Sequence, residues 1–216
     1  MTETIDNPMF ARLWTLLSGH EPAAMRRLRR ENLAGLAGSV LEVGAGTGTN
    51  FAHYPTTVTN VVALEPERRL AARATEAAVT APVPVLVTTA AIEDLPDGNI
   101  AATAQFDAVV CSLVLCSVDD PAAVLRRLFE LLRPGGELRF AEHVAVDHGA
   151  RAGLQRLADR TVWPRLMGNC HTHRHTEKAI AAAGFEITTV RREWLLPAWV
   201  PAPVGPIAIG RAVRPA

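Results

Sequence analysis

The stretch SVLEVGAGTG, residues 39–48, places a short apolar run directly before three closely spaced glycines. The run Val40–Val43 is typical of a buried strand, and the glycines allow the backbone to turn tightly beside a ligand. A dinucleotide site would have the spacing G-x-G-x-x-G, whereas the spacing here is G-x-G-x-G. Glu42 would repel a pyrophosphate, but it suits the ammonium group of an amino-acid-bearing nucleoside.

A second acidic residue stands at the end of the next apolar run. That run covers Val58–Leu64, and Glu65 follows it, 21 positions after Gly44. A carboxylate there can accept hydrogen bonds from the two hydroxyls of a ribose; a simple helix N-terminal carboxylate is the alternative. The glycine loop alone is a weak signal, but together with Glu42 and Glu65 it predicts a nucleoside-binding site.

The rest of the chain alternates apolar runs with amphipathic stretches. Strands are predicted at residues 40–43, 58–64, 83–87, 106–113, 138–142, 187–190 and 207–212. Helices are predicted at residues 10–18, 22–36, 49–53, 67–79, 120–132, 151–163 and 176–183. This order predicts an α/β fold, a doubly wound and mostly parallel sheet with helices on both faces. Its ligand should bind beyond the carboxyl ends of the strands.

Charge and composition exclude several classes of protein. The chain has 22 basic and 22 acidic residues, and this balance argues against a nucleic-acid partner. No apolar run approaches the roughly 20 residues of a membrane helix, so no integral membrane segment is expected. The start of the chain is polar and acidic, unlike a secretory signal. The three cysteines are odd in number and indicate reduced thiols, which predicts a cytoplasmic protein.

Five segments, in this order, resemble the motifs of class I S-adenosylmethionine-dependent methyltransferases. They are LEVGAGTGTN at 41–50, VVALEPERR at 61–69, EDLP at 93–96, FDAVVCSLVLCSVDDP at 106–121 and LLRPGGEL at 131–138. The resemblance implies a Rossmann-like sheet of seven strands whose last strand is antiparallel and lies beside the sixth. It also implies a single domain of residues 1–216. In it, residues 1–38 form a helical N-terminal cap, 39–145 the cofactor-binding core and 146–216 the acceptor side.

The resemblance further implies S-adenosylmethionine as the cofactor and S-adenosylhomocysteine as its product. The methionine moiety is expected to contact the glycine loop and its flanks: Glu42, Gly44, Ala45, Gly46, Gly48 and Asn50. The ribose is expected at Glu65, with Pro66 shaping the turn and Arg69 at the adenine edge. The adenine is expected beside Ala91, Ile92 and Glu93. The sulfonium is expected above the end of the fourth strand, at Cys111, Ser112 and Leu113.

A narrower resemblance concerns the acceptor. LEVGAGTGTNFAHYP, VVCSLVLCSV, LRPGGELRFAEHVA and GNCHTHRH are similar to segments of the methyltransferase-like alkyl-thiol S-methyltransferases. Menaquinone and ubiquinone C-methyltransferases share the first half, but they match CSLVLCSV and EHVA less well. The animal thiol enzymes carry an apolar N-terminal anchor that has no counterpart here. The resemblance therefore favours methylation of a small, fairly apolar acceptor, with a thiol as the leading candidate.

Other accepting atoms and a non-catalytic role stay open. O-, N- or C-methylation of a phenol, an amine or a quinone-like metabolite is one alternative, and a cofactor-binding protein without catalysis is another. His143, just after the fifth strand, is the candidate base and a candidate acceptor contact, with Glu142 able to orient its imidazole. A structural histidine is equally compatible with this position. Trp163 and Trp194 are candidates for the acceptor pocket, and ordinary packing explains them as well.

Several polar clusters are interpreted as structural. The segment Cys170–His175 contains metal-ligand residue types, but its spacing matches no common site, so no metal is predicted. Thr176 is instead expected to cap the helix that follows. Cys116 is expected to fill the core, and Asp120 to cap the helix at 120–132. The arginines of the second helix are expected to form a solvated face: Arg26, Arg27, Arg29 and Arg30.

Overall fold

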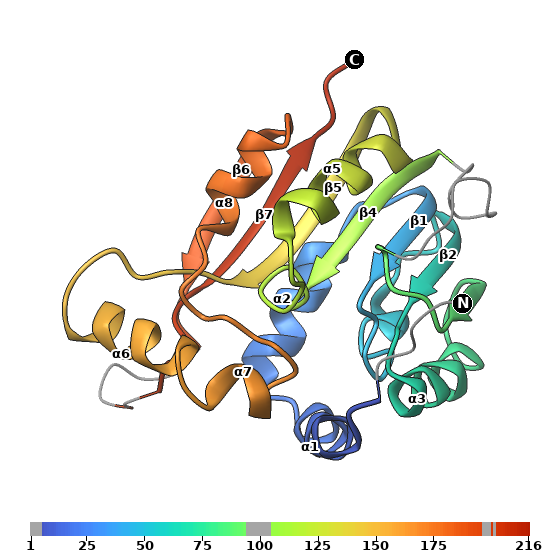
Figure 1. Cartoon of the computed structure of the whole chain (residues 1–216). Helices are drawn as coiled ribbons and strands as arrows, with labels where there is room; N and C mark the ends of the chain where they lie inside the picture. The colour runs from blue at the N-terminus through green and yellow to red at the C-terminus, as the bar shows by residue number, and fades with distance from the viewer. Residues whose placement is uncertain (1–5, 94–104, 196–199, 201) are drawn as a thin grey trace.

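The computed structural model describes residues 6–93, 105–195, 200 and 202–216, so most of the EDLP motif lies outside the described residues. Seven strands form one sheet with the order β3-β2-β1-β4-β5-β7-β6 (Figure 1). The strands are β1 Gly38–Val43, β2 Val58–Leu64, β3 Val85–Thr88, β4 Phe106–Ser112, β5 Leu132–His143, β6 Glu186–Glu193 and β7 Ile207–Val213. The helices are α1 Pro8–Gly19, α2 Ala23–Leu33, α3 Arg68–Ala78, α5 Pro121–Leu131, α6 Ala150–Asp159, α7 Trp163–Leu166 and α8 Thr176–Ala182.

The predicted fold class is confirmed. Strands β1 to β5 pair in parallel, whereas β7 lies antiparallel between β5 and β6. Alternate residues of one strand serve opposite faces of the sheet: Leu41 packs with the side chains of α5 and α8, and Val40 packs with those of α3. The helix α2 covers β5 and β7 on the face opposite α5 and α8. The sheet is thus buried on both sides, and its carboxyl edge is left for the site.

Some element boundaries differ from the prediction. The stretch after the glycine loop is only a short 3-10 helix, Phe51–His53, because the chain turns directly into Pro55. The strand β5 begins at Leu132, six residues early, and pairs irregularly with β4 around the Pro134 turn. Thr176 is the first residue of α8 and not its cap, since the cap position belongs to His175.

The arginine face of α2 is not uniformly solvated, so that expectation is wrong for one residue. Arg29 is buried, pairs with Glu21 at 2.7 Å and donates to Asn50 Oδ1 at 2.9 Å. Arg27 stays exposed and pairs with Glu193. One side of α2 therefore contacts the residues under the glycine loop. The number of arginines in the helix could not show that one of them points inward. In the part of the chain that the structure describes, no helix has the length and apolarity to cross a membrane.

The predicted cap of α5 is confirmed and can be tested by substitution. The Asp120 carboxylate accepts the N–H groups of Ala122 and Ala123 at 2.9 and 3.0 Å. We expect Asp120→Ala to lower the free energy of unfolding by about 1 kcal/mol, because these two N–H groups lose their acceptor. Urea denaturation measures the change. Asp120→Asn keeps an acceptor and should lose much less; an equal loss would show that charge and not capping matters.

Candidate active site

The glycine loop turns at the end of β1 in a form that excludes side chains. Gly44, Gly46 and Gly48 all have positive φ angles, of 65°, 59° and 77°. A Cβ on Gly44 would lie 2.5 Å from the Val114 side chain, and one on Gly46 would lie 2.8 Å from Nε1 of Trp14. Both the backbone conformation and the close neighbours therefore require glycine.

Glu42 lies beneath this loop and not on its surface. It is 2% exposed, and it accepts hydrogen bonds from Asn50 Nδ2 at 2.9 Å and from the Tyr54 hydroxyl at 2.6 Å. Burial raises the pKa of Glu42 to about 7, although the bonds from Tyr54 and Asn50 and the nearby Arg29 oppose the shift. A cationic ligand above the loop would favour the ionised carboxylate.

Asn50 connects the donor side of the site. Besides Glu42, its side-chain amide donates to the Ser112 hydroxyl at 3.2 Å, and its oxygen accepts from Arg29. Asn50 is 1% exposed, so it links β1, β4 and α2 from inside. The structure thus brings three predicted cofactor residues together, with Arg29 and Tyr54 as partners to which the sequence analysis gave no role in the site.

Glu65 stands at the end of β2 and holds the glycine loop. Its two carboxylate oxygens accept the N–H groups of Gly46 at 2.7 Å and of Glu67 at 3.0 Å. Burial raises its pKa to about 7, opposed by these two backbone bonds. A carboxylate has about four acceptor positions, so both oxygens retain one for ribose hydroxyls.

The other predicted cofactor residues are spread along the same edge. Pro66 is half-buried next to Glu65, whereas Arg69 is exposed and pairs with Asp6 at 2.6 Å and Glu67 at 2.8 Å. Ile92 is buried in the core and Glu93 is exposed. Ala45 is buried in the core cluster on the α3 face. Ala91 lies between the core and the surface, and its role with Ile92 and Glu93 stays a prediction.

The end of β4 has an unusual backbone. Cys111 is completely buried, and Leu113 takes a φ of 61°, a left-handed conformation that is rare for a branched side chain. The Leu113 N–H donates to the Ala141 carbonyl at 2.9 Å, which keeps the turn beside β5. Backbone strain of this kind collects at functional sites, and here it lies where the sulfonium is predicted.

Glu142 does not orient the imidazole of His143, so that expectation is wrong. Its buried carboxylate accepts the N–H groups of Val114 at 3.0 Å and Cys116 at 3.2 Å. The loop after β4 has no neighbouring strand, so the carboxylate supplies the acceptor that these two backbone N–H groups require. Burial raises the pKa of Glu142, and the backbone bonds oppose the shift.

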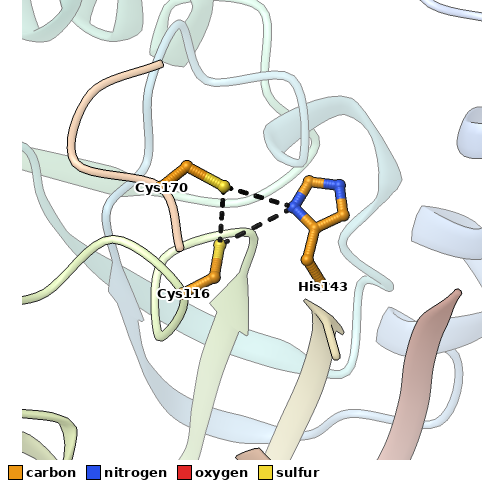
Figure 2. Close-up of side chains that lie close together, drawn as sticks. All are labelled: Cys116, His143 and Cys170. Carbon is orange, nitrogen blue, oxygen red and sulfur yellow. Dashed lines mark hydrogen bonds between the residues drawn. The ribbon is translucent and has the colours of Figure 1, made fainter. Parts of the chain in front are cut away.

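His143 faces two cysteines from distant parts of the chain. Its Nδ1 lies 3.8 Å from Sγ of Cys116 and 3.6 Å from Sγ of Cys170, and the two sulfurs are 3.7 Å apart (Figure 2). Burial would lower the pKa of His143, but Cys116 and Glu142 raise it overall. Cys116 is buried as expected, but it is more than a core filler because it faces His143 and Cys170.

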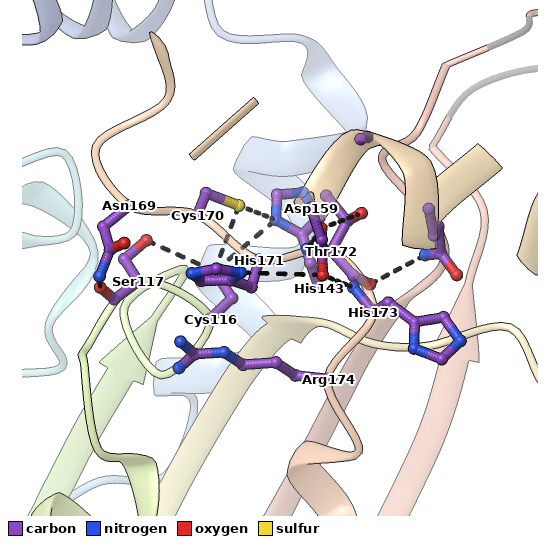
Figure 3. Close-up of polar contacts among 12 residues, drawn as sticks. Cys116, Ser117, His143, Asp159, Asn169, Cys170, His171, Thr172, His173 and Arg174 are labelled. Carbon is purple, nitrogen blue, oxygen red and sulfur yellow. Dashed lines mark hydrogen bonds and ion pairs between the residues drawn. The ribbon is translucent and has the colours of Figure 1, made fainter. Parts of the chain in front are cut away.

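The rest of the segment after α7 is fixed by Asp159. The Asp159 carboxylate accepts from the Thr172 N–H at 2.7 Å and from the His173 N–H at 3.0 Å (Figure 3). The rings of His173 and His175 contact each other edge to face, with centroids 5.6 Å apart. Among the described residues, the group of metal-ligand types that includes Cys170 contains none of the histidines of this segment.

The two candidate acceptor tryptophans have different surroundings. Trp163 begins α7, and its indole nitrogen is buried without a hydrogen-bond partner, close enough to Cys170 to lower the pKa of that thiol. Trp194 is 45% exposed, and the guanidinium carbon of Arg151 lies over its ring, 4.5 Å from the ring centroid. Trp163 thus lies near Cys170, which faces His143, whereas Trp194 makes a surface contact.

The helix α1 lies over the site. Trp14 contacts Gly46 of the glycine loop, and the Phe10 ring packs on Gly168 of the acceptor side. The two rings stack with centroids 5.8 Å apart, and Thr47 donates to the Ser18 hydroxyl at 3.0 Å. The amphipathic pattern of α1 indicated a buried face, but it could not show which surface that face covers.

Comparison with known proteins decides the family. A family model described as a methyltransferase domain matches residues 17–190. The chain belongs to this methyltransferase family. The chain is 36% identical over 191 residues to a mouse (Mus musculus) thiol S-methyltransferase, TMT1B, covering 85% of this chain and 75% of the mouse protein. It is 30% identical over 188 residues to the human (Homo sapiens) thiol S-methyltransferase TMT1A, covering 82% of this chain and 74% of the human protein.

Solved structures agree on the fold. The N-methyltransferase NodS of Bradyrhizobium japonicum, solved with S-adenosylhomocysteine, superimposes with a TM-score of 0.62 at 15% identity, covering 97% of this chain and 89% of NodS. The family match and the curated relatives make the protein an S-adenosylmethionine-dependent methyltransferase, as predicted, and NodS shows the same fold with S-adenosylhomocysteine bound. The individual residues that contact the cofactor stay predictions.

The ribose role of Glu65 gives a binding prediction. We expect Glu65→Gln to raise the Kd for S-adenosylmethionine about tenfold or more, because a charged hydrogen bond contributes about 1.5–3 kcal/mol. Calorimetry above the Glu65 pKa of about 7 measures it. Glu76→Gln, on the exposed side of α3, is the matched control. Equal affinities of the two variants would contradict the ribose role.

The predicted cap gives a second binding prediction. Removing residues 1–20 should raise the Kd for S-adenosylmethionine at least about tenfold, because Trp14 then no longer covers Gly46. Trp14→Ala should reproduce most of this change, and Leu16→Ala, at an exposed position of α1, should not. Unchanged affinity of the truncated protein would show that α1 is no cap for the cofactor.

Proposed function

We propose that this methyltransferase moves the methyl group of S-adenosylmethionine to the sulfur of a small, fairly apolar thiol. The observation that carries the proposal is the likeness, over most of the chain, to enzymes named for thiol S-methylation. In the reaction the thiol loses its proton, its sulfur bonds the methyl carbon, and the bond from that carbon to the sulfonium breaks. A thioether and S-adenosylhomocysteine leave.

The positions of the glycine loop, Glu65 and Leu113 support their assignment to the methyl donor. Glu65 and the glycine loop would hold the ribose and the methionine moiety, since each Glu65 oxygen keeps a free acceptor position. The strained turn at Leu113 would lie under the sulfonium. Because Ser112 pairs with Ala141, the methyl group and His143 would face each other across two neighbouring strand ends.

A thiol acceptor fits the chemistry of this edge. A free thiol has a pKa of about 8.5, so a small shift yields the thiolate, whereas an aliphatic alcohol needs a strong base. His143 Nδ1 faces two sulfurs, and its other ring nitrogen points away from them (Figure 2). The enzyme would act mainly by proximity, alignment and exclusion of water. The three free cysteines also support a reducing, cytoplasmic compartment.

A product assay tests the acceptor. Purified protein is incubated with S-adenosylmethionine and a panel of alkyl and aryl thiols, phenols, amines and a naphthoquinol, and both S-adenosylhomocysteine and the methylated acceptor are measured by mass spectrometry. We expect methylated thiols only, and Glu65→Gln should reduce their formation by about tenfold or more at limiting cofactor. Turnover of phenols, amines or quinols without thiols would overturn the proposal while leaving the cofactor site intact.

A further inference from the structure

Three metal-binding side chains meet at the acceptor side of the carboxyl edge. Cys116 comes from the loop after β4, His143 ends β5, and Cys170 lies between α7 and α8. One ligand atom from each residue lies within 4.8 Å of the others, and both cysteines are buried. Figure 2 shows both sulfurs and Nδ1 pointing toward one another.

The spacing of the three atoms agrees with one particular metal geometry. The sulfur–sulfur distance is 3.7 Å, and the sulfur–nitrogen distances are 3.6 and 3.8 Å. Tetrahedral zinc, with bonds of about 2.3 Å to sulfur and 2.0–2.1 Å to nitrogen, separates two sulfurs by about 3.8 Å and sulfur from nitrogen by about 3.6 Å. A disulfide needs sulfurs about 2.05 Å apart, so the cysteines are placed as two separate ligands.

We propose that Cys116, His143 and Cys170 bind one zinc ion, and that the fourth position receives the sulfur of the acceptor thiol. Three protein ligands with one open position are typical of catalytic zinc, and two thiolates with one imidazole are a soft donor set that suits it. This departs from the sequence-based prediction of no metal, which considered only the spacing within Cys170–His175.

The surrounding chain holds the three ligands without help from the metal. Glu142 accepts the Cys116 N–H, and the Cys116 carbonyl accepts the His171 N–H at 2.7 Å, so the two cysteine segments are joined through the backbone. The Cys170 N–H donates to the Met167 carbonyl at 3.1 Å. The Trp163 indole N–H is near Cys170 and is buried without a hydrogen-bond partner.

The charges at the cluster also suit a divalent ion. Two thiolates and a neutral imidazole carry two negative charges, and Zn²⁺ cancels them inside a buried site. Arg174 lies close enough to interact with both cysteines, but its guanidinium donates to the Leu115 carbonyl at 2.8 Å. Glu142 is also near, and its carboxylate is committed to the backbone of Val114 and Cys116.

Coordination would activate the acceptor, and this part of the inference rests on the proposed function. A thiol that binds zinc loses its proton to solvent and is held as a thiolate. Its sulfur then bonds the methyl carbon, S-adenosylhomocysteine leaves, and the neutral thioether dissociates because it is a weaker ligand than a thiolate. His143 is then a ligand, and no general base is needed.

Metal analysis of the full-length protein is the first test. Protein purified under reducing conditions is exposed to excess zinc, desalted and measured by mass spectrometry, with a chromophoric chelator as competitor for affinity. We expect one zinc per chain in the wild type, and at least a tenfold weaker affinity in Cys116→Ser, His143→Gln and Cys170→Ser. Cys111→Ala and His173→Gln, which change a buried thiol and a nearby histidine outside the cluster, should retain wild-type zinc.

Any of three results of the zinc measurements would overturn the metal site. They are a wild type that binds no zinc, an affinity that the cluster variants do not change, or loss of the same zinc in His173→Gln. A Cys116–Cys170 disulfide that forms in reducing buffer and excludes metal would overturn it as well. Circular dichroism identifies a cluster variant that does not fold. In that case the zinc content of the wild type still decides whether the metal site exists.

Cobalt substitution tests the open position separately from turnover. The cobalt protein should show the visible spectrum of tetrahedral thiolate coordination, and an alkyl thiol should shift it, whereas the matching thioether should not. An unshifted spectrum overturns the role of the metal in acceptor binding. If the protein binds zinc and the cobalt spectrum responds to thiols, but the product assay yields no methylated thiol, the proposed function fails and the metal site stands. If the product assay yields methylated thiol but the protein binds no zinc, the proposed function stands and the metal site fails.

Discussion

The buried carboxylate of Glu142 sets the geometry on which both halves of the site depend. By accepting the Val114 and Cys116 N–H groups, it holds a loop that leaves the sheet with no strand beside it. Val114 fills the space over Gly44, and Cys116 faces His143. Without this carboxylate two buried or part-buried backbone N–H groups would lose their acceptor, at a cost of about 1–3 kcal/mol each. The donor loop and the acceptor cluster are thus positioned by one side chain.

On the donor side, buried acidic groups support a loop that has few side chains of its own. Glu42 and Glu65 both have a pKa of about 7, because burial disfavours their charge. A positively charged ligand would lower the pKa of both carboxyls again, since it favours their ionised form. The glycine loop allows close approach to the backbone, and a cationic ligand beside it would favour the ionised form of these carboxyls.

Local sequence pattern predicted the sheet, and it singled out the residues that the structure gathers around the glycine loop, because both are encoded by neighbouring residues. Apolar runs, the glycine spacing and Glu65 follow directly from periodicity and turn chemistry. The acceptor side was less predictable: Cys116, His143 and Cys170 come together only through the pairing of β4 with β5 and the return of the chain after α7. Arg29 was misassigned for a similar reason, since its charge indicated solvent while its position indicated the core. Long-range contacts of this kind leave no trace in local spacing.

The stacked pair Phe10–Trp14 lets α1 contact both halves of the site. One end of the pair rests on Gly168, two residues before Cys170, and the other rests on Gly46 of the donor loop. Both rings belong to α1, so a displacement of this helix that frees the glycine loop would also remove the Phe10 contact with the segment that carries Cys170.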